Sequence, residues 1–177
     1  MTCERVIAID IDPEKIAMAR HNAAIYGVQD RIEFIIGDYF QIIPNLRPDV
    51  IFLSPPWGGP EYLDQKTFDI SNMAGLDGIE IFNLAYRLTR NVAYFVPRNT
   101  DAAALARLAG QGNRVEIEQN ILNWKTKTIT AYYGGLIVDN DEESKEMNGG
   151  DDDEEIGPRN GTEQFDETDA DAFDLFG

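Results

Sequence analysis

Residues 5–13 read RVIAIDIDP, a short apolar run that ends in two aspartates and a proline. A run this short and rich in β-branched residues predicts a buried strand over residues 5–10. Asp12 can accept hydrogen bonds at the start of a helix whose first residue is Pro13. Gly27 can end that helix. This stretch therefore predicts a strand followed by a helix.

The alternation of strands and helices continues to residue 138. Apolar runs and helical spacing predict strands over residues 31–36, 49–53 and 92–96 and helices over residues 77–88 and 101–108. Residues 61–76 predict an irregular loop. Two long strands, residues 114–122 and 126–138, are joined by a short turn and predict an antiparallel pair. We therefore expect an α/β fold with a mostly parallel sheet and a C-terminal antiparallel strand pair.

The charge of the chain is divided unevenly. Residues 1–138 hold 13 basic and 16 acidic side chains, a net charge of −3, whereas residues 139–177 hold 2 and 16, a net charge of −14. The first part is long enough to bury a core, and we treat it as one partial domain. The second part has too little apolar surface to offset its chain entropy, so we expect a disordered acidic tail. Such a tail either stays solvated or binds basic protein partners.

Composition excludes several classes of protein. The single cysteine, Cys3, cannot form an internal disulfide, and one cysteine with one histidine does not supply a zinc site. We expect no metal. No apolar run approaches the ~18 residues of a membrane span, and no secretory signal is found. These features predict a soluble protein of a reducing compartment.

Charged residues follow three of the strands, at the edge where ligands of such sheets bind. Asp10 ends the first strand, where its carboxylate can accept hydrogen bonds from ribose hydroxyls or cap the next helix. Asp38 follows the second strand and can face an adenine amino group or form a turn. Arg98 follows the strand 92–96 and can bind a phosphate or form a surface ion pair.

The motif Ser54-Pro-Pro-Trp57 is the most specific signal in the chain. Two prolines make the turn rigid and remove two backbone donors, so carbonyl groups can face a cleft. The Ser54 hydroxyl and a proline carbonyl can then accept hydrogen bonds from an exocyclic amine and aim its lone pair at a methyl donor. Trp57 can stack on a base beside them. The alternative is a proline-rich turn with a structural role only.

These motifs together resemble the trimethylguanosine synthase family of class I, Rossmann-like methyltransferases. The resemblance covers residues 5–138 and rests on VIAIDIDP (6–13), FLSPPWGGP (52–60), YFVPRN (94–99), VEIEQN (115–120) and KTITAY (127–132). It implies transfer of methyl groups from S-adenosylmethionine to the exocyclic N2 of 7-methylguanosine caps on small nuclear and nucleolar RNA. It also implies a location in the nucleus, in nucleoli or nuclear bodies, with the cytoplasm as a second location.

The resemblance assigns a role to each candidate residue. It implies cofactor binding by Asp10, Asp38 and Ser54, catalysis by Ser54 and Pro55, and cap binding by Trp57 and Arg98. Because 7-methylguanine is cationic, the stacking on Trp57 would include a cation–π attraction.

The chain departs from this family in one respect. The family's fold starts with a strand and a turn, Asp-x-Phe-x-Gly-x-Gly-Gly, that holds the methionine part of the cofactor, and this sequence contains neither. That strand lies inside the sheet, so we expect a gap between the strands 5–10 and 49–53. We expect an N-terminally truncated form of an active enzyme. The alternatives are a non-catalytic short form, an interaction protein acting through its tail, and a site completed by another chain.

Overall fold

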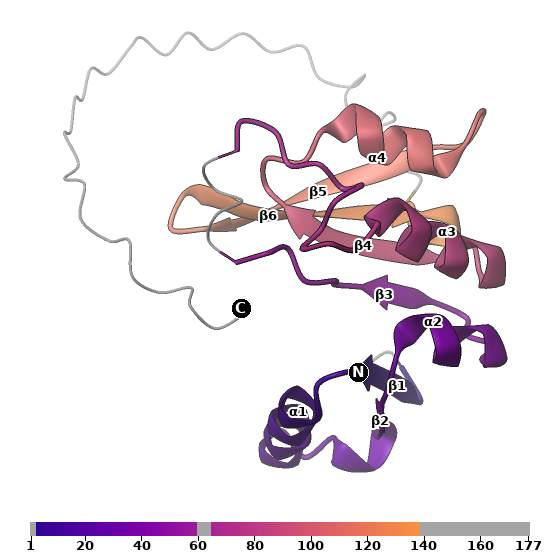
Figure 1. Cartoon of the computed structure of the whole chain (residues 1–177), viewed down its shortest axis with the longest axis vertical. Coiled ribbons are helices and arrows are strands. Elements are labelled where there is room, and N and C mark those ends of the chain that lie inside the picture. Colours follow the sequence, from indigo (N-terminus) through magenta and orange to yellow (C-terminus); the bar gives the residue numbers. More distant parts are fainter. Residues whose placement is uncertain (1–2, 60–64, 139–177) are drawn as a thin grey trace, which may run out of the picture.

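The computed structural model describes residues 3–59 and 65–138, which alternate between strands and helices (Figure 1). The strands are β1 (Val6–Asp10), β2 (Ile32–Ile36), β3 (Ile51–Leu53), β4 (Val92–Pro97), β5 (Val115–Leu122) and β6 (Lys125–Tyr133). The helices are α1 (Pro13–Ile25), α2 (Tyr39–Ile42), α3 (Gly78–Leu88) and α4 (Ala102–Ala109). The predicted α/β class is confirmed.

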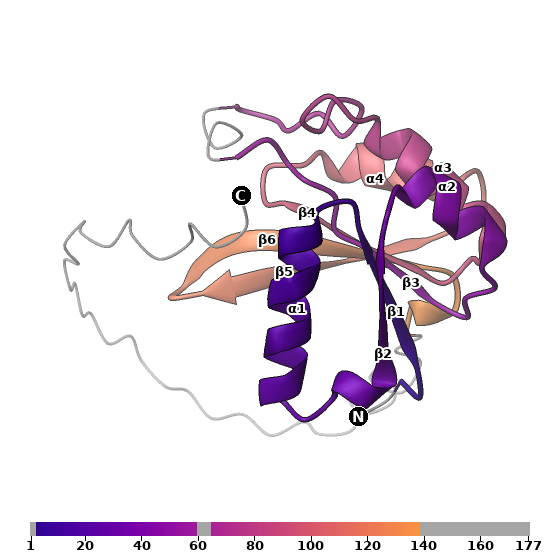
Figure 2. The same ribbon diagram turned by 60° about the horizontal axis from the view of Figure 1, so that its bottom comes forward.

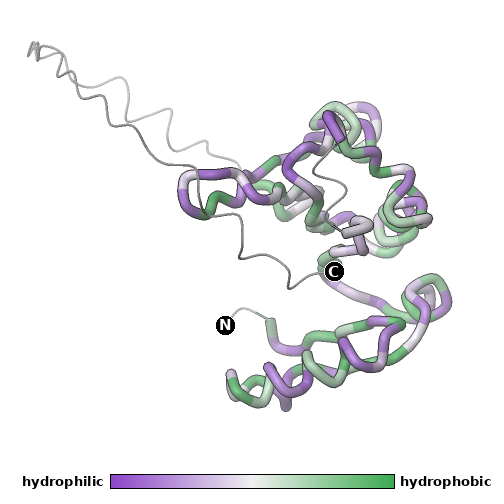
Figure 3. The backbone as a smooth tube through the Cα atoms, turned by 60° about the vertical axis from the view of Figure 1, so that its left-hand side comes forward, coloured by the Kyte–Doolittle hydropathy of each residue, from purple (hydrophilic) through white to green (hydrophobic). Residues whose placement is uncertain are grey.

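The strands form two separate groups. β1 and β2 pair in parallel, whereas the second group is a four-stranded sheet in the order β3-β4-β6-β5. In this sheet β6 alone runs against its neighbours, because it pairs antiparallel with both β4 and β5. Among the described residues no strand joins β1 to β3, so the expected gap is confirmed. Figure 3 shows the two groups as neighbouring bodies.

Aspartates begin the helices because their carboxylates satisfy backbone donors that have no partner within the helix. Asp12, Asp77 and Asp101 each accept a hydrogen bond from the N–H two residues later, at 2.8 to 2.9 Å. These three helix starts were predicted. The helix α2 was not, because four residues are too few to show a helical spacing of apolar side chains.

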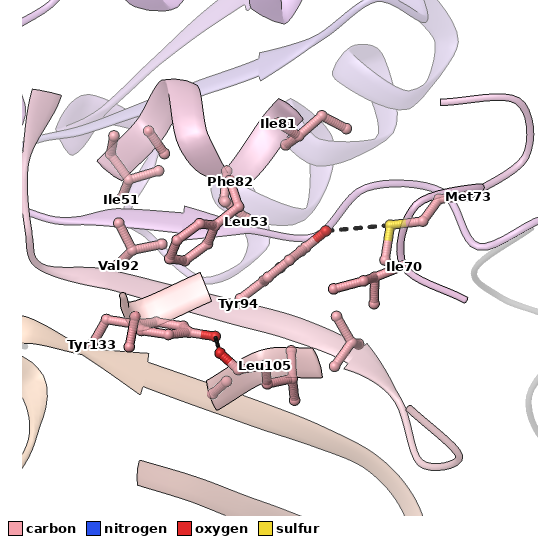
Figure 4. Close-up of a cluster of buried hydrophobic side chains, with 14 of the residues drawn as sticks. Ile51, Leu53, Ile70, Met73, Ile81, Phe82, Val92, Tyr94, Leu105 and Tyr133 are labelled. Atoms are coloured by element: carbon pink, nitrogen blue, oxygen red, sulfur yellow. Dashed lines mark hydrogen bonds between the residues drawn. The ribbon is translucent and has the colours of Figure 1, made fainter. Parts of the chain in front are cut away.

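The main core lies between the four-stranded sheet and helices α3 and α4 (Figure 4). Its largest fully buried side chains include Tyr94, Tyr133, Phe82, Met73 and Leu105. The Tyr133 hydroxyl donates to the Leu105 carbonyl at 3.0 Å and so links β6 to α4. The Tyr94 hydroxyl lies 3.1 Å from the Gly78 carbonyl, which links β4 to the start of α3.

The unit β1–α1–β2 adds no residue to this core. Figure 2 shows α1 on the opposite side of the strands from α2, α3 and α4. Ile16 and Ala23 of α1 are buried, whereas Met18 and Ile25 are 58% and 69% exposed. Tyr26 is 80% exposed. It follows the last helical residue, where no other described element covers it.

Two further boundaries differ from those expected. β6 ends at Tyr133 and not at Val138, because Gly134 has a φ of +66° and residues 134–136 form a 3-10 turn. β3 begins at Ile51, two residues later than expected.

The proposed tail, residues 139–177, lies outside the described residues. In the part that is described, no helix is both long and apolar enough to cross a membrane.

Candidate active site at the strand ends

Asp10 lies at the carboxyl end of β1, beside the end of β2. The N–H of Gly37 donates to the Asp10 carbonyl at 2.9 Å, which places Asp38 next to Asp10. One carboxylate oxygen of Asp10, Oδ1, accepts the N–H of Asp12 at 2.9 Å. The other oxygen accepts no hydrogen bond from a described residue, and the side chain is half-buried. Asp10 therefore keeps an acceptor for a ligand at this edge, although it also forms a local turn.

The Asp38 carboxylate already accepts hydrogen bonds from neighbouring residues of the protein. Its Oδ1 accepts the N–H of Phe40 at 2.9 Å, and its Oδ2 lies 3.4 Å from the Gln41 amide nitrogen. The turn-forming alternative is therefore what the structure shows, and contact with adenine stays a prediction. The next residue, Tyr39, donates its hydroxyl to the Ile81 carbonyl at 3.0 Å, and burial raises its pKa to about 12. This neutral donor holds α2, and with it Asp38, against α3.

The loop after β3 carries the most specific motif. Ser54 is exposed and its hydroxyl makes no hydrogen bond to a described residue, while Pro55 is half-buried. Gly58 and Gly59 follow with φ values of +93° and +76°, which residues with a side chain rarely adopt. The two glycines therefore turn the chain directly after Trp57.

Trp57 is positioned by β4. Its ring lies on Phe95, with 5.2 Å between the centroids and 36° between the planes. Phe95 in turn lies 6.1 Å from the ring of Phe52 on β3. Trp57 is half-buried, so the sheet supports a tryptophan that is still partly accessible at the strand ends. The contact fixes the plane in which a base could stack.

Arg98 is exposed and follows the end of β4. Its Nη1 donates to the Thr126 carbonyl at 3.3 Å, so the guanidinium group is directed toward β6. The alternative of a surface ion pair is not observed among the described residues. Phosphate binding by Arg98 remains a prediction.

Residues 1–136 match the profile of a family described as RNA cap guanine-N2 methyltransferase. The chain belongs to this family. It is 37% identical over 134 residues to the trimethylguanosine synthase of Schizosaccharomyces pombe, covering 72% of this chain and 56% of that protein. It is 35% identical over 108 residues to the Saccharomyces cerevisiae protein of the same name, covering 58% of this chain and 34% of that protein. The resemblance drawn from the motifs is confirmed, and the chain spans about half or less of these relatives.

Solved structures that match this chain are less similar to it in sequence than the two trimethylguanosine synthases. A structure titled "Human methyltransferase 10 domain containing protein" superposes with a TM-score of 0.49 at 14% identity, covering 73% of this chain and 59% of that chain. A likeness of this size carries no conclusion about function.

Two aromatic residues, Phe95 and Trp124, were not predicted as site residues from the sequence. Phe95 gave no signal, because an aromatic residue in a strand is ordinary and its contact with Trp57 joins residues far apart in sequence. Trp124 lies in the turn between β5 and β6 and is 99% exposed. The position of Trp124 between two strands would have been the available signal.

No group of metal-binding side chains occurs among the described residues.

Proposed function

We propose that this protein takes part in S-adenosylmethionine-dependent methylation of N2 of the 7-methylguanosine cap of RNA. The observation that carries the proposal is the contact of Trp57 with Phe95, in the same loop as Ser54 and Pro55. These residues lie at the same edge as Asp10, where a nucleoside cofactor binds in this class of sheet. Membership of the cap guanine-N2 methyltransferase family supports this assignment.

The strand-end carboxylates fit the nucleoside part of S-adenosylmethionine. Asp10 is half-buried and its second oxygen accepts no hydrogen bond from the described chain, which suits a ribose hydroxyl. The Asp38 carboxylate would accept the adenine amino group in addition to its present donors, the Phe40 N–H and the Gln41 side-chain amide. These residues would hold the nucleoside part of the cofactor. The cofactor, when bound, supplies the methyl group.

The protein's own contribution to the reaction is positional. The Ser54 hydroxyl and the Pro55 carbonyl would accept the two N–H groups of the guanine amine, which aims the nitrogen lone pair at the methyl donor. Trp57 would stack on 7-methylguanine, whose positive charge adds a cation–π attraction of roughly 1–2 kcal/mol. Unmethylated guanine lacks that charge and should bind less tightly.

The Trp57→Ala variant tests this proposal. We expect the affinity for 7-methylguanosine triphosphate to fall roughly tenfold, because about 1.4 kcal/mol corresponds to one decade. Binding of S-adenosylhomocysteine should change little, because Trp57 is assigned to the base and not to the cofactor. Isothermal titration of the full chain measures both ligands. An equal loss of both, or equal affinity for methylated and unmethylated guanosine triphosphate, would contradict the stacking role.

We also propose that the substrates are small nuclear and nucleolar RNAs and that the protein acts in the nucleus. The support is the family resemblance. Binding of basic partner proteins by residues 139–177 is kept as a further proposal, supported by their net charge of −14. Recovery of capped small nuclear RNA with the tagged protein from nuclear extract, and its loss in Trp57→Ala, would support the assignment of the substrate.

A further inference from the structure

The turn between β5 and β6 holds a tryptophan in an unfavourable position. Leu122 pairs with Lys125, so Asn123 and Trp124 form a two-residue turn, with φ values of +52° and +61°. Such turns favour asparagine and glycine, because both central residues adopt the left-handed conformation. For a bulky residue such as tryptophan this conformation is a genuine outlier.

Packing does not account for Trp124. The side chain is 99% exposed, so it buries no apolar surface against the described chain. Its left-handed backbone conformation reduces stability, and no packing contact with the described chain compensates for this. Strained residues of this kind concentrate at binding sites. Trp124 is therefore a candidate contact for a ligand.

The topology places this turn beside the candidate active site. Pro97, the last residue of β4, pairs with Thr128, so β6 and its turn extend beyond the end of β4. Figure 1 shows the β5–β6 hairpin projecting past the ends of β3 and β4. Arg98 donates to the Thr126 carbonyl at 3.3 Å. Only Lys125 lies between Thr126 and Trp124, so Arg98 contacts β6 close to the turn.

The charge at this turn is positive, although the whole chain carries −17. Residues 119–127 contain Lys125 and Lys127 and no acidic side chain. Lys125 directly follows Trp124, and Lys127 lies two residues further along β6, where the register between β5 and β6 shifts at Asn120 and Ile121. An accessible aromatic ring beside lysine and arginine is the combination by which proteins bind single-stranded nucleic acid.

We propose that Trp124 stacks on a base of the RNA that follows the cap, while Lys125 and Arg98 contact its phosphates. The inference rests on the proposed function, because the cap places the RNA at this edge. It adds a second stacking residue beyond Trp57. The two tryptophans would then hold different parts of one substrate, the cap base and a nucleotide of the chain.

The variant Trp124→Gly tests the inference in the full chain. Glycine adopts a φ of +61° without strain, so the variant should have an unfolding midpoint equal to or above that of the parent chain. We expect its affinity for a capped single-stranded RNA of about twelve nucleotides to fall roughly tenfold. Its affinity for 7-methylguanosine triphosphate should not change. Fluorescence anisotropy measures both affinities, and thermal unfolding reports the stability.

Two further variants sharpen the test. Tyr26→Ala is the matched control, because Tyr26 is also a highly exposed aromatic residue, at 80%, and it lies at the far end of α1. It should leave RNA affinity unchanged. Lys125→Gln should reduce the dependence of log K on log salt by about 0.7, the value for one phosphate contact to a single strand.

The outcomes separate this inference from the proposed function. Unchanged RNA affinity in Trp124→Gly, or an equal loss in Tyr26→Ala, overturns the role of Trp124. Failure of Trp57→Ala to weaken binding of 7-methylguanosine triphosphate overturns the cap assignment instead. If Trp124→Gly weakens binding of capped and uncapped RNA alike while the cap nucleotide is not bound, the RNA contact stands and the proposed function falls.

Discussion

Asp10 and Asp12 lie two residues apart and have different roles. The Oδ1 atom of Asp12 accepts the N–H groups of Glu14 and Lys15, at 2.8 and 3.4 Å, so this carboxylate begins α1. The Asp10 carboxylate accepts only the N–H of Asp12 within the described chain and keeps its second oxygen for a ligand. The same residue type is therefore structural at one position and available at the other, because only Asp12 directly precedes the helix.

This difference predicts the behaviour of two matched variants. Asp10→Asn retains an oxygen for the N–H of Asp12 but loses the charge that would bind the ribose. We expect its affinity for S-adenosylhomocysteine to fall about tenfold, because hydrogen bonds to charged groups contribute roughly 1.5–3 kcal/mol. Asp12→Asn should bind normally, because asparagine begins helices as well as aspartate does. Calorimetric titration measures this, and equal losses in both variants would argue against a cofactor role for Asp10.

At the scale of the elements, β4 and β6 hold the core together through buried tyrosines. Tyr94 and Tyr133 are fully buried, and burial raises the pKa of both hydroxyls above the ordinary value of 10. Below that value both groups are neutral in the folded and unfolded chains. Above it the unfolded chain loses protons first, so the stability that these groups contribute is lost as the pH rises further.

We therefore expect the midpoint of urea unfolding to fall as the pH rises above about 10. Tyr133→Phe should show a shallower fall, because one of the groups that ionises on unfolding is absent. Near neutral pH the same variant should be less stable by about 1 kcal/mol, because it loses the hydrogen bond to the Leu105 carbonyl. Tyr26→Phe, at an exposed position, is the control. Equal slopes in all three chains would show that burial of Tyr133 does not govern the alkaline transition.

At the scale of the whole molecule, the net charge is distributed unevenly between two parts of the sequence, and the strands form two separate groups. Residues 1–138 are close to neutral and contain both groups of strands, while residues 139–177 carry most of the net negative charge. The proposed RNA contacts at Arg98 and Lys125 belong to the first part. A polyanionic segment on the same chain opposes the approach of another polyanion, and the effect weakens as salt screens it.

Neutralising residues 151–155, which read DDDEE, to NNNQQ should therefore raise the affinity for capped RNA. The gain should be several-fold at about 50 mM salt and should nearly vanish at about 500 mM. Affinity measurements across a salt series provide the test, with parent and variant at matched ionic strength. A gain that is independent of salt would exclude electrostatic competition as its cause.

The sequence by itself determined the order of strands and helices, the aspartates that begin three helices, the motif at Ser54–Trp57 and the family. It also indicated the gap between β1 and β3. These features could be predicted because periodic burial, helix capping and motif spacing depend on residues close together in the chain.

Only the tertiary structure decided which candidate residues keep groups for a ligand. It placed Phe95 under Trp57, directed Arg98 toward Thr126 and used the Asp38 carboxylate to begin α2. It also left Trp124 exposed at the edge of the candidate site. The contacts of Phe95 with Trp57 and of Arg98 with Thr126 join segments that are distant in the chain. They arise when strands pair in a particular register, and a pattern of neighbouring residues does not encode that register.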